Sequence, residues 1–326
     1  MIERLPLLAW PTTSPQLTIL SYHRVLAHCD PLRPGEVDAV TFDRQMSLLS
    51  SCFSVMPLPE AAPALRQGRL PRRACCITFD DGYADNLTVA APILARYGLP
   101  ATVFVATGYL DGGRMFNDTV IDFIASVRSS FLDLDHLGLG HHRLSNDADR
   151  RGAIAAVLAV VRFVPPAQRE YLVARMLEAA PCGPLPTNLM LTSEQLKELS
   201  CRGFEIGGHT VSHTVLTTLD DATAMTEIGE GKHGLEGIVG KKLTSFAYPN
   251  GRPAKDYGAA HVAMIEKLGF ELAVTTAPGV ARSCSDLYQL PRFAPWGRSA
   301  TLFAARMTRN ARAAEAIASH QPVLRA

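Results

Sequence analysis

Short apolar runs alternate with amphipathic stretches along most of the chain. The apolar runs are rich in aliphatic and β-branched residues, as buried strands are, and lie at residues 16–22, 75–79, 101–106, 203–206, 243–248, 272–275 and 290–293. Stretches with apolar residues at helical spacing separate them, starting at Thr41 and covering residues 61–67, 84–97, 193–201, 220–239 and 261–268. Strands that alternate with helices in this way favour a parallel α/β barrel.

One region interrupts this alternation. Residues 115–190 show helical patterns at 117–127, 148–163 and 166–179, and the stretch 133–147 between the first two reads as a loop. We therefore predict a helical insertion at 115–190. The neighbouring His141 and His142 raise the question of a metal site, but exposed loop histidines are the simpler interpretation.

These patterns predict three parts. Residues 1–15 form an irregular lead-in, and residues 16–300 form the barrel with its insertion at 115–190. Residues 301–326 follow as a C-terminal segment whose Ala- and Arg-rich part, 301–318, is helical.

Two adjacent carboxylates end one of the apolar runs. Asp80, Asp81 and Gly82 follow the strand pattern of residues 75–79, so both carboxylates lie at a strand end, where α/β folds build active sites. Adjacent carboxylates repel each other, and a metal ion or a proton can separate their roles. The alternative is a plain strand end followed by a helix cap, because Asp is a good N-cap residue.

A pair of histidines follows another short strand pattern. His209 and His213 are four residues apart in G-G-H-T-V-S-H, and on a helical turn that spacing places both imidazoles on one face. Alone, the pair is weak evidence for a metal site. Together with Asp80 and Asp81, it fits a catalytic zinc site with three protein ligands and an open position.

Both motifs carry a resemblance to a known family. T-F-D-D-G at 78–82 and H-T-V-S-H at 209–213 resemble the first two motifs of the NodB-type polysaccharide deacetylases, carbohydrate esterase family four. The resemblance covers most of residues 16–296 and implies a distorted parallel (β/α)7-type barrel. It also implies that Asp80 is the general base, while Asp81, His209 and His213 hold the metal.

The general acid of the family takes an unusual place in this chain. The usual C-terminal L-x-H motif is missing, whereas I-L-S-Y-H at 19–23 is a strand pattern that ends in His23. This order resembles the circularly permuted branch typified by poly-N-acetylglucosamine deacetylases, in which the catalytic histidine comes first. The resemblance therefore implies that His23 is the general acid; a core histidine satisfied by backbone groups is the alternative.

Two further motifs depart from the family. F-A-Y-P-N-G at 246–251 resembles the third motif, which implies that the backbone N–H of Asn250 stabilises the oxyanion, although a plain turn fits equally well. The usual motif arginine falls on Ala247, and A-V-T-T at 273–276 replaces the Asp-rich fourth motif. We expect Arg292 to supply the missing guanidinium and to pair with Asp80; an ordinary surface arginine is the alternative.

Composition limits the partners and the compartment. The net charge of +1 gives no case for nucleic acid or an anionic membrane as a partner. The first residues lack a signal-peptide pattern, and no apolar run is long enough for a transmembrane helix. Seven cysteines without a C-x-x-C pattern indicate free thiols. We therefore expect a cytoplasmic protein without a transmembrane segment.

Together these observations predict a metal-dependent hydrolase. It removes N-acetyl groups from a hexosamine-containing polysaccharide or its lipid-linked precursor, releases acetate and serves exopolysaccharide assembly. Zinc is the expected metal, and Co, Ni, Fe or Mn also suit two imidazoles and a carboxylate. An amidase or deformylase of the same fold that acts on a small amide is the alternative. A glycan-binding protein without activity is a third interpretation, against which the complete set of base, acid and ligands speaks.

Overall fold

The structure is a computed structural model that describes residues 15–294 and 299–313. The expected lead-in at 1–15 lies almost wholly outside the described residues, as do residues 314–326 of the predicted C-terminal segment. None of the described helices is long and apolar enough to span a membrane.

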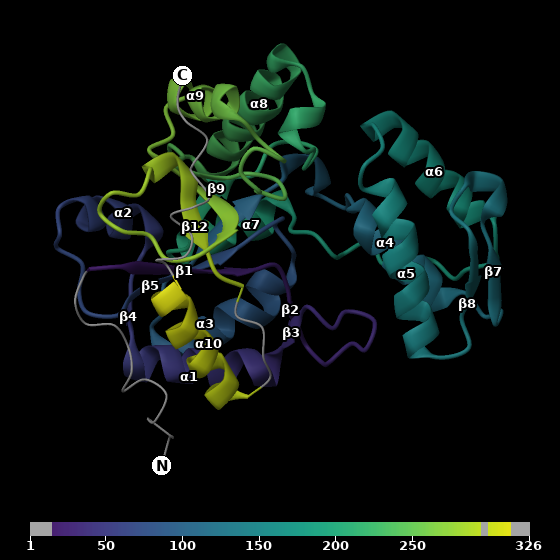
Figure 1. The fold of residues 1–326 in the computed structure, drawn as a ribbon, viewed down its shortest axis with the longest axis horizontal. Coiled ribbons are helices and arrows are strands. Elements are labelled where there is room, and N and C mark those ends of the chain that lie inside the picture. The colour runs from purple at the N-terminus through teal and green to yellow at the C-terminus, as the bar shows by residue number, and fades with distance from the viewer. Residues whose placement is uncertain (1–14, 295–298, 314–326) are drawn as a thin grey trace. The chain divides into compact units, whose positions relative to one another are not determined.

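Seven parallel strands form the centre of the larger part of the chain (Figure 1). In spatial order they are β1 (Leu17–Tyr22), β5 (Ala74–Phe79), β6 (Thr102–Val105), β9 (Glu205–Gly208), β10 (Ser245–Ala247), β11 (Leu272–Pro278) and β12 (Leu290–Arg292). The first and last strands also meet, because the N–H of Phe293 donates to the carbonyl of Ile19 at 2.8 Å. The strands thus form a nearly closed barrel, and the predicted distorted parallel (β/α)7-type barrel is confirmed.

Alternate residues of the strands face two apolar clusters. One cluster joins Leu17, Ile19, Cys76 and Phe104 to helix α2 (Leu58–Arg66). The other packs the opposite faces of the strands against six further helices of this part of the chain, namely α1 (Ala39–Cys52), α3 (Ala91–Tyr97), α7 (Ser193–Cys201), α8 (Asp221–Val239), α9 (Ala259–Lys267) and α10 (Ala300–Ala313). The barrel strands are therefore buried on both faces, as parallel strands usually are.

Several short elements complete this part of the chain. β4 (Ser54–Val55) pairs with β5 outside the barrel path, and β2 (Val25–Leu26) pairs with β3 (Val37–Asp38). Single 3-10 turns lie at η3 (Thr107–Tyr109), η5 (Leu216–Thr218) and η6 (Leu287–Gln289).

Two of the expected elements were wrong in detail. The helix expected over residues 84–97 starts as a π-helical turn, η2 (Asn86–Ala90), and becomes α3 only at Ala91. The loop expected over 133–147 contains an antiparallel hairpin of β7 (Phe131–Asp133) and β8 (His141–Arg143) around η4 (Asp135–Leu137). Strands of three residues are too short to show an alternating pattern in sequence.

A second compact unit consists of residues 29–34 and 112–190. It holds the β7–β8 hairpin and three helices, α4 (Phe116–Ser126), α5 (Asp147–Val161) and α6 (Pro166–Glu178), around its own apolar core, which includes Val120, Phe123, Val157 and Met176.

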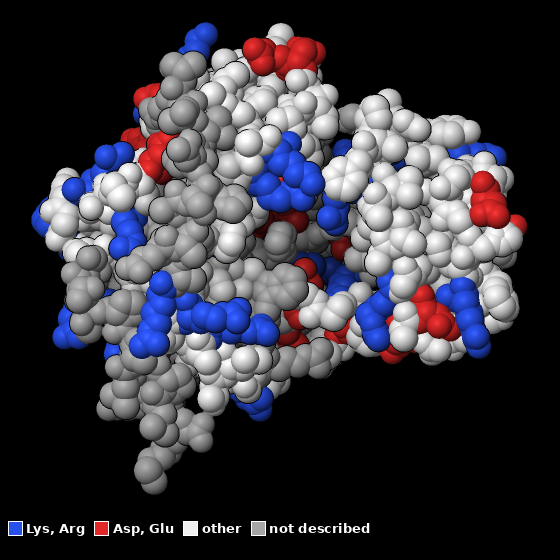
Figure 2. Space-filling view, in the orientation of Figure 1, with Lys and Arg blue, Asp and Glu red and all other residues white. Residues whose placement is uncertain are grey.

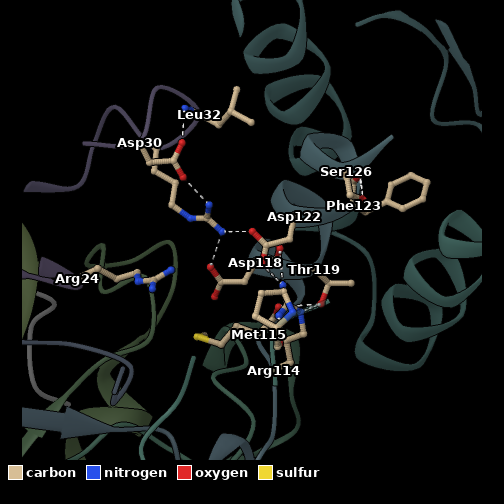
Figure 3. A network of polar contacts seen from close by, with 12 residues as sticks. Arg24, Asp30, Leu32, Arg114, Met115, Asp118, Thr119, Asp122, Phe123 and Ser126 are labelled. Atoms are coloured by element: carbon tan, nitrogen blue, oxygen red, sulfur yellow. Dashed lines mark hydrogen bonds and ion pairs between the residues drawn. The ribbon is translucent and has the colours of Figure 1, made fainter. Parts of the chain in front are cut away.

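Segment 29–34 belongs to this second unit through Arg33. Its guanidinium donates to Asp30 at 2.7 Å and to Asp122 at 2.5 Å, and it lies 3.5 Å from the buried Asp118. Figure 3 labels these three carboxylates. Arg114 reaches the other oxygen of Asp122. Sequence patterns gave no sign that a segment so far from 112–190 joins it.

Surface charge is mixed in sign. Figure 2 shows Lys and Arg interspersed with Asp and Glu over the face in view, as a formal net charge of +1 would lead one to expect. This distribution gives the surface in view no strong field of either sign.

Candidate active site

Neighbouring strand ends place His23 beside the Asp80–Asp81 pair. Strands β1 and β5 run parallel with Tyr22 opposite Phe79, and the N–H of Asp80 donates to the carbonyl of Tyr22 at 2.9 Å. His23 and Asp80 are therefore the first residues beyond two adjacent strands, at the same end of the barrel.

A sharp turn brings the second carboxylate into the site. Asp81 and Gly82 both have left-handed backbone conformations, with φ of 75° and 85°. Asp tolerates this region better than most residues, and a side chain at Gly82 would place its Cβ 2.9 Å from Val105. The D-D-G sequence thus turns the chain abruptly away from β5 directly after Asp80.

Asp81 lies between the two histidines of the second motif. Its Oδ1 is 3.4 Å from Nε2 of His209 and 3.3 Å from Nε2 of His213, and the three ligand atoms lie within 4.8 Å of one another. The helical geometry expected for the histidine pair was wrong: residues 209–213 form a loop in which Thr210 and His213 have φ of 64° and 53°. The loop still brings both imidazoles to one carboxylate oxygen.

These three side chains fit a divalent cation. Within the described part of the chain, Oδ1 of Asp81 is buried without a hydrogen-bond partner, which is costly unless a positive group faces it. Burial lowers the pKa of His213 to about 4, so this imidazole is neutral near pH 7. Burial alone would raise the pKa of Asp81, but His213 and His209 outweigh it and hold that pKa well below its usual range. An ionised carboxylate and a neutral imidazole are the forms that bind metals.

The orientation of His209 also suits a metal ligand. Its Nδ1 lies 2.7 Å from the backbone carbonyl of Ala247, so Nδ1–H is the donor and Nε2 keeps its lone pair toward Asp81. Ala247 is the last residue of β10, at the position where the family motif carries an arginine. The backbone at the end of β10 thus fixes the orientation of the His209 ring.

Glu227 of α8 supports the loop between the two histidines. Its carboxylate accepts hydrogen bonds from the N–H groups of Val211 and Ser212 at 3.1 and 2.8 Å, and from the Ser212 hydroxyl at 2.9 Å. These bonds hold a loop with two left-handed residues in one conformation. Sequence analysis missed Glu227, because nothing in a helix pattern shows which loop one of its side chains will reach.

Arg292 forms a two-point ion pair with Asp80. Its two terminal nitrogens lie 2.7 Å from the two carboxylate oxygens, and Nε donates to the carbonyl of Thr275 at 2.9 Å. Both charged residues are only 2% exposed. Burial alone raises the pKa of Asp80, but Arg292 more than compensates and lowers it, which keeps the carboxylate ionised.

Asn250 occupies a tight turn after β10. Its φ is 56°, and its carbonyl accepts from the hydroxyl of Thr276, while the N–H of Thr276 donates to Gly251 at 2.9 Å. Among the described residues, nothing accepts a hydrogen bond from the N–H of Asn250. This donor therefore remains available at the end of the strand that contacts His209.

His23 is exposed at the surface and lies in the field of several carboxylates. Partial loss of hydration lowers the pKa of its imidazole, but Asp81, Asp80 and Glu36 outweigh this effect and raise the pKa above its ordinary value. A raised pKa keeps the proton-donating form of His23 present at higher pH. Asp85 and Asn86, which sequence analysis also missed, contact the backbone around His23.

Comparisons with known proteins agree with this geometry. The sequence pattern described as "Polysaccharide deacetylase" matches residues 67–273, which is more than half of the chain and includes both motifs. The chain belongs to the polysaccharide deacetylase family. It is therefore an enzyme of a family of hydrolases that act on carbon–nitrogen bonds other than peptide bonds.

Individual relatives extend the similarity over most of the chain. YxkH of Bacillus subtilis (strain 168), named as a polysaccharide deacetylase, is 26% identical over 288 residues, which are 87% of this chain and 74% of YxkH. The structure is also similar to Streptococcus pyogenes deacetylase PplD, with a TM-score of 0.59 and 22% identity over 86% of this chain and 93% of PplD. IcaB from Ammonifex degensii matches with a TM-score of 0.57 and 18% identity over 91% and 97%. These structural likenesses show that the chain shares its fold with both proteins.

A second group of metal-ligating side chains lies on the β7–β8 hairpin. Nε2 of His141 is 2.9 Å from Asp133 and 3.3 Å from Asp135, but all three side chains are more than half exposed. Oδ1 of Asp133 already accepts from the N–H of Asp135. His142 contacts the carbonyl of Leu139 at 2.7 Å. Contacts within the hairpin thus explain why these side chains lie close together.

Proposed function

We propose that this deacetylase is metal-dependent and removes N-acetyl groups from a hexosamine-containing polysaccharide or its lipid-linked precursor, releasing acetate. The observation that carries the proposal is the buried Oδ1 of Asp81, which faces His209 and His213 without a hydrogen-bond partner, next to the Asp80–Arg292 pair. Membership of the polysaccharide deacetylase family supports the glycan substrate.

Asp81, His209 and His213 are the residues that would hold the cation. Zinc is our first choice, because two imidazoles and one carboxylate with an open position form a common catalytic zinc site, and Co, Ni, Fe and Mn suit the same donors. When bound, such a cation acts as a Lewis acid that polarises the amide carbonyl and makes water easier to deprotonate.

The other residues supply the proton transfers. Asp80, kept ionised by Arg292, takes a proton from the attacking water as the new carbon–oxygen bond forms. The N–H of Asn250 donates to the oxyanion. His23 gives its proton to the amide nitrogen as the carbon–nitrogen bond breaks, so that acetate and a free amine leave.

The test is acetate release from defined substrates. N-acetylglucosamine oligomers are incubated with the zinc-loaded wild type and with Asp80→Asn, and small amides such as formamide and allantoin are assayed alongside. We expect acetate from the oligomers, at least about 100-fold less with Asp80→Asn, and no turnover of the small amides. Turnover of a small amide without acetate release from any glycan would replace this proposal with the amidase alternative.

A second variant separates the acid from the metal ligands. His23→Ala is expected to lower turnover of the oligomers strongly while the metal content stays at the wild-type level, because His23 is absent from the group of atoms around Asp81. An equal loss of metal would instead make His23 a ligand.

A further inference from the structure

Three consecutive residues at the end of β1 are tied to two consecutive residues after the D-D-G motif. The side-chain amide of Asn86 donates to the carbonyl of His23 at 2.9 Å. One carboxylate oxygen of Asp85 accepts from the N–H of Val25 at 3.2 Å, and the other accepts from Nε of Arg24 at 2.8 Å. Asp85 and Asn86 therefore hold the backbone of His23 and Val25 and the side chain of Arg24.

Both side chains are buried where they make these contacts. Asn86 is 0% exposed and Asp85 9% exposed. A buried carboxylate and a buried amide are unfavourable unless hydrogen bonds satisfy them. Asp85 and the side-chain N–H of Asn86 find these partners on residues 23–25, whereas Oδ1 of Asn86 has no partner among the described residues.

The local backbone explains how Asp85 and Asn86 reach the end of β1. Residues Asn86–Ala90 form a π-helical turn, in which the N–H of Ala91 donates to the carbonyl of Asn86, five residues earlier. π-helical turns are rare and occur often at functional sites. Here the turn starts only a few residues after Asp81, so one short segment carries the base, a proposed metal ligand and the contacts to His23.

Arg24 is anchored from further sides. Its guanidinium lies over the ring of Tyr83, with 4.8 Å between Cζ and the ring centroid. The backbone N–H of Arg24 donates to the carboxylate of Glu36 at 3.1 Å. The residue after His23 is thus fixed through its backbone and its side chain.

We infer that Asp85 and Asn86 are positioning residues for His23: they fix the backbone after β1 so that the imidazole stays within reach of the leaving amine. The inference rests on the proposed function, in which His23 is the general acid. A general acid must lie within hydrogen-bond distance of the atom that it protonates, and a displacement of about 1 Å can lower a rate about 100-fold.

The experiment compares two substrates that differ in whether the leaving group must be protonated by a general acid. An N-acetylglucosamine oligomer loses an amine, which must be protonated to leave, whereas 4-nitrophenyl acetate loses a stable phenolate without protonation. The variants are Asn86→Ala, Asp85→Asn, which keeps the shape of the side chain, and His23→Ala. Thr88→Ala serves as the matched control, because Thr88 lies in the same π-helical turn, is exposed and donates its hydroxyl to the carbonyl of Ala84. All are measured in the zinc-loaded full chain.

We expect Asn86→Ala and Asp85→Asn to lower kcat on the oligomer at least about tenfold, with KM, metal content and ester hydrolysis within about twofold of the wild type. Thr88→Ala should match the wild type on both substrates. A lower kcat with an unchanged KM on the oligomer would by itself indicate that the acid is less well positioned, without the ester measurement.

Three results would overturn the inference. Equal losses on both substrates would show that Asp85 and Asn86 only stabilise the fold, and unchanged kcat in both variants would show that His23 needs no such support. Either result, with a selective loss in His23→Ala, leaves the proposed function standing. If His23→Ala itself shows no selective loss, the acid assignment fails and the inference fails with it.

Discussion

Arg292, the last residue of β12, holds Asp80, the first residue beyond β5, through two hydrogen bonds of 2.7 Å. The two residues lie 212 positions apart in the chain, and both are buried. The position where the family motif carries its arginine is Ala247 in this chain. We propose that Arg292 replaces that motif arginine from a different strand and keeps the base ionised and oriented.

Arg292→Lys tests this role. Lysine keeps the positive charge but cannot form the two-point contact, so Asp80 is oriented less well and its pKa rises. We expect turnover to fall at least about tenfold and the acidic limb of the pH–rate profile to move to higher pH. Arg96→Lys is the control, because Arg96 is exposed and pairs with Asp43 at the surface. An unchanged pH–rate profile in Arg292→Lys would remove the role from Arg292.

Glu227→Gln probes the support of the histidine loop. The amide cannot accept from two N–H groups and a hydroxyl as strongly as the carboxylate does, so the loop from Thr210 to His213 becomes looser. We expect metal affinity, measured by competition with a chelator, to fall about tenfold. Glu230→Gln, one turn away and exposed on the same helix, should leave affinity unchanged. Equal affinities in the two variants would contradict the supporting role.

Asp85 should make folding stability depend on pH. Burial raises its pKa to about 6, above the value of about 3.9 expected in the unfolded chain. Between about pH 4 and 6 the folded state therefore binds a proton that the unfolded state has released, so stability falls as pH rises through this window, by about 3 kcal/mol at most.

Asp85→Asn lacks this proton. As pH rises from about 4 to 6, we expect the free energy of unfolding of the variant to increase relative to that of the wild type. Above about pH 7 the difference between the two free energies should stay constant. Denaturant unfolding at a series of pH values measures the difference. A difference that stays constant across the window would show that the pKa of Asp85 is ordinary in the folded protein.

Gly207 marks a close approach between strands. A Cβ there would lie 2.4 Å from the ring of Phe104 and 2.8 Å from the hydroxyl of Ser245. Gly207→Ala is expected to lower the free energy of unfolding by about 1–3 kcal/mol, because neither neighbour is free to move far. Gly234→Ala is the control: the nearest atom to its Cβ is 3.9 Å away, so stability should stay equal or rise by about 0.5–1 kcal/mol. Similar effects in both variants would contradict this account of Gly207.

The fold was predictable because its pattern is regular. Buried strands and amphipathic helices alternate with the periods that sequence patterns reveal, and the D-D-G and H-T-V-S-H motifs each follow a strand. Strand ends of a parallel barrel meet on one side, so the motifs alone indicated which side carries Asp80, Asp81 and His209.

The rest depends on conformations and contacts that leave no periodic pattern. Thr210 and His213 adopt left-handed conformations that a four-residue spacing does not reveal, so a helical turn was expected in place of a loop. Arg33 joins segment 29–34 to residues far away in sequence, and the partner of Glu227 depends on tertiary packing. Such contacts become visible only in three dimensions.

Metal content is the most direct test of the central claim. Elemental analysis of protein purified without chelators compares the wild type with Asp81→Ala, and Asp133→Ala serves as the control for the exposed hairpin group. We expect about one zinc or similar divalent ion per chain in the wild type and in Asp133→Ala, and little in Asp81→Ala. A wild type that holds no metal, even after zinc or cobalt is added, would contradict the proposed metal-dependent deacetylase.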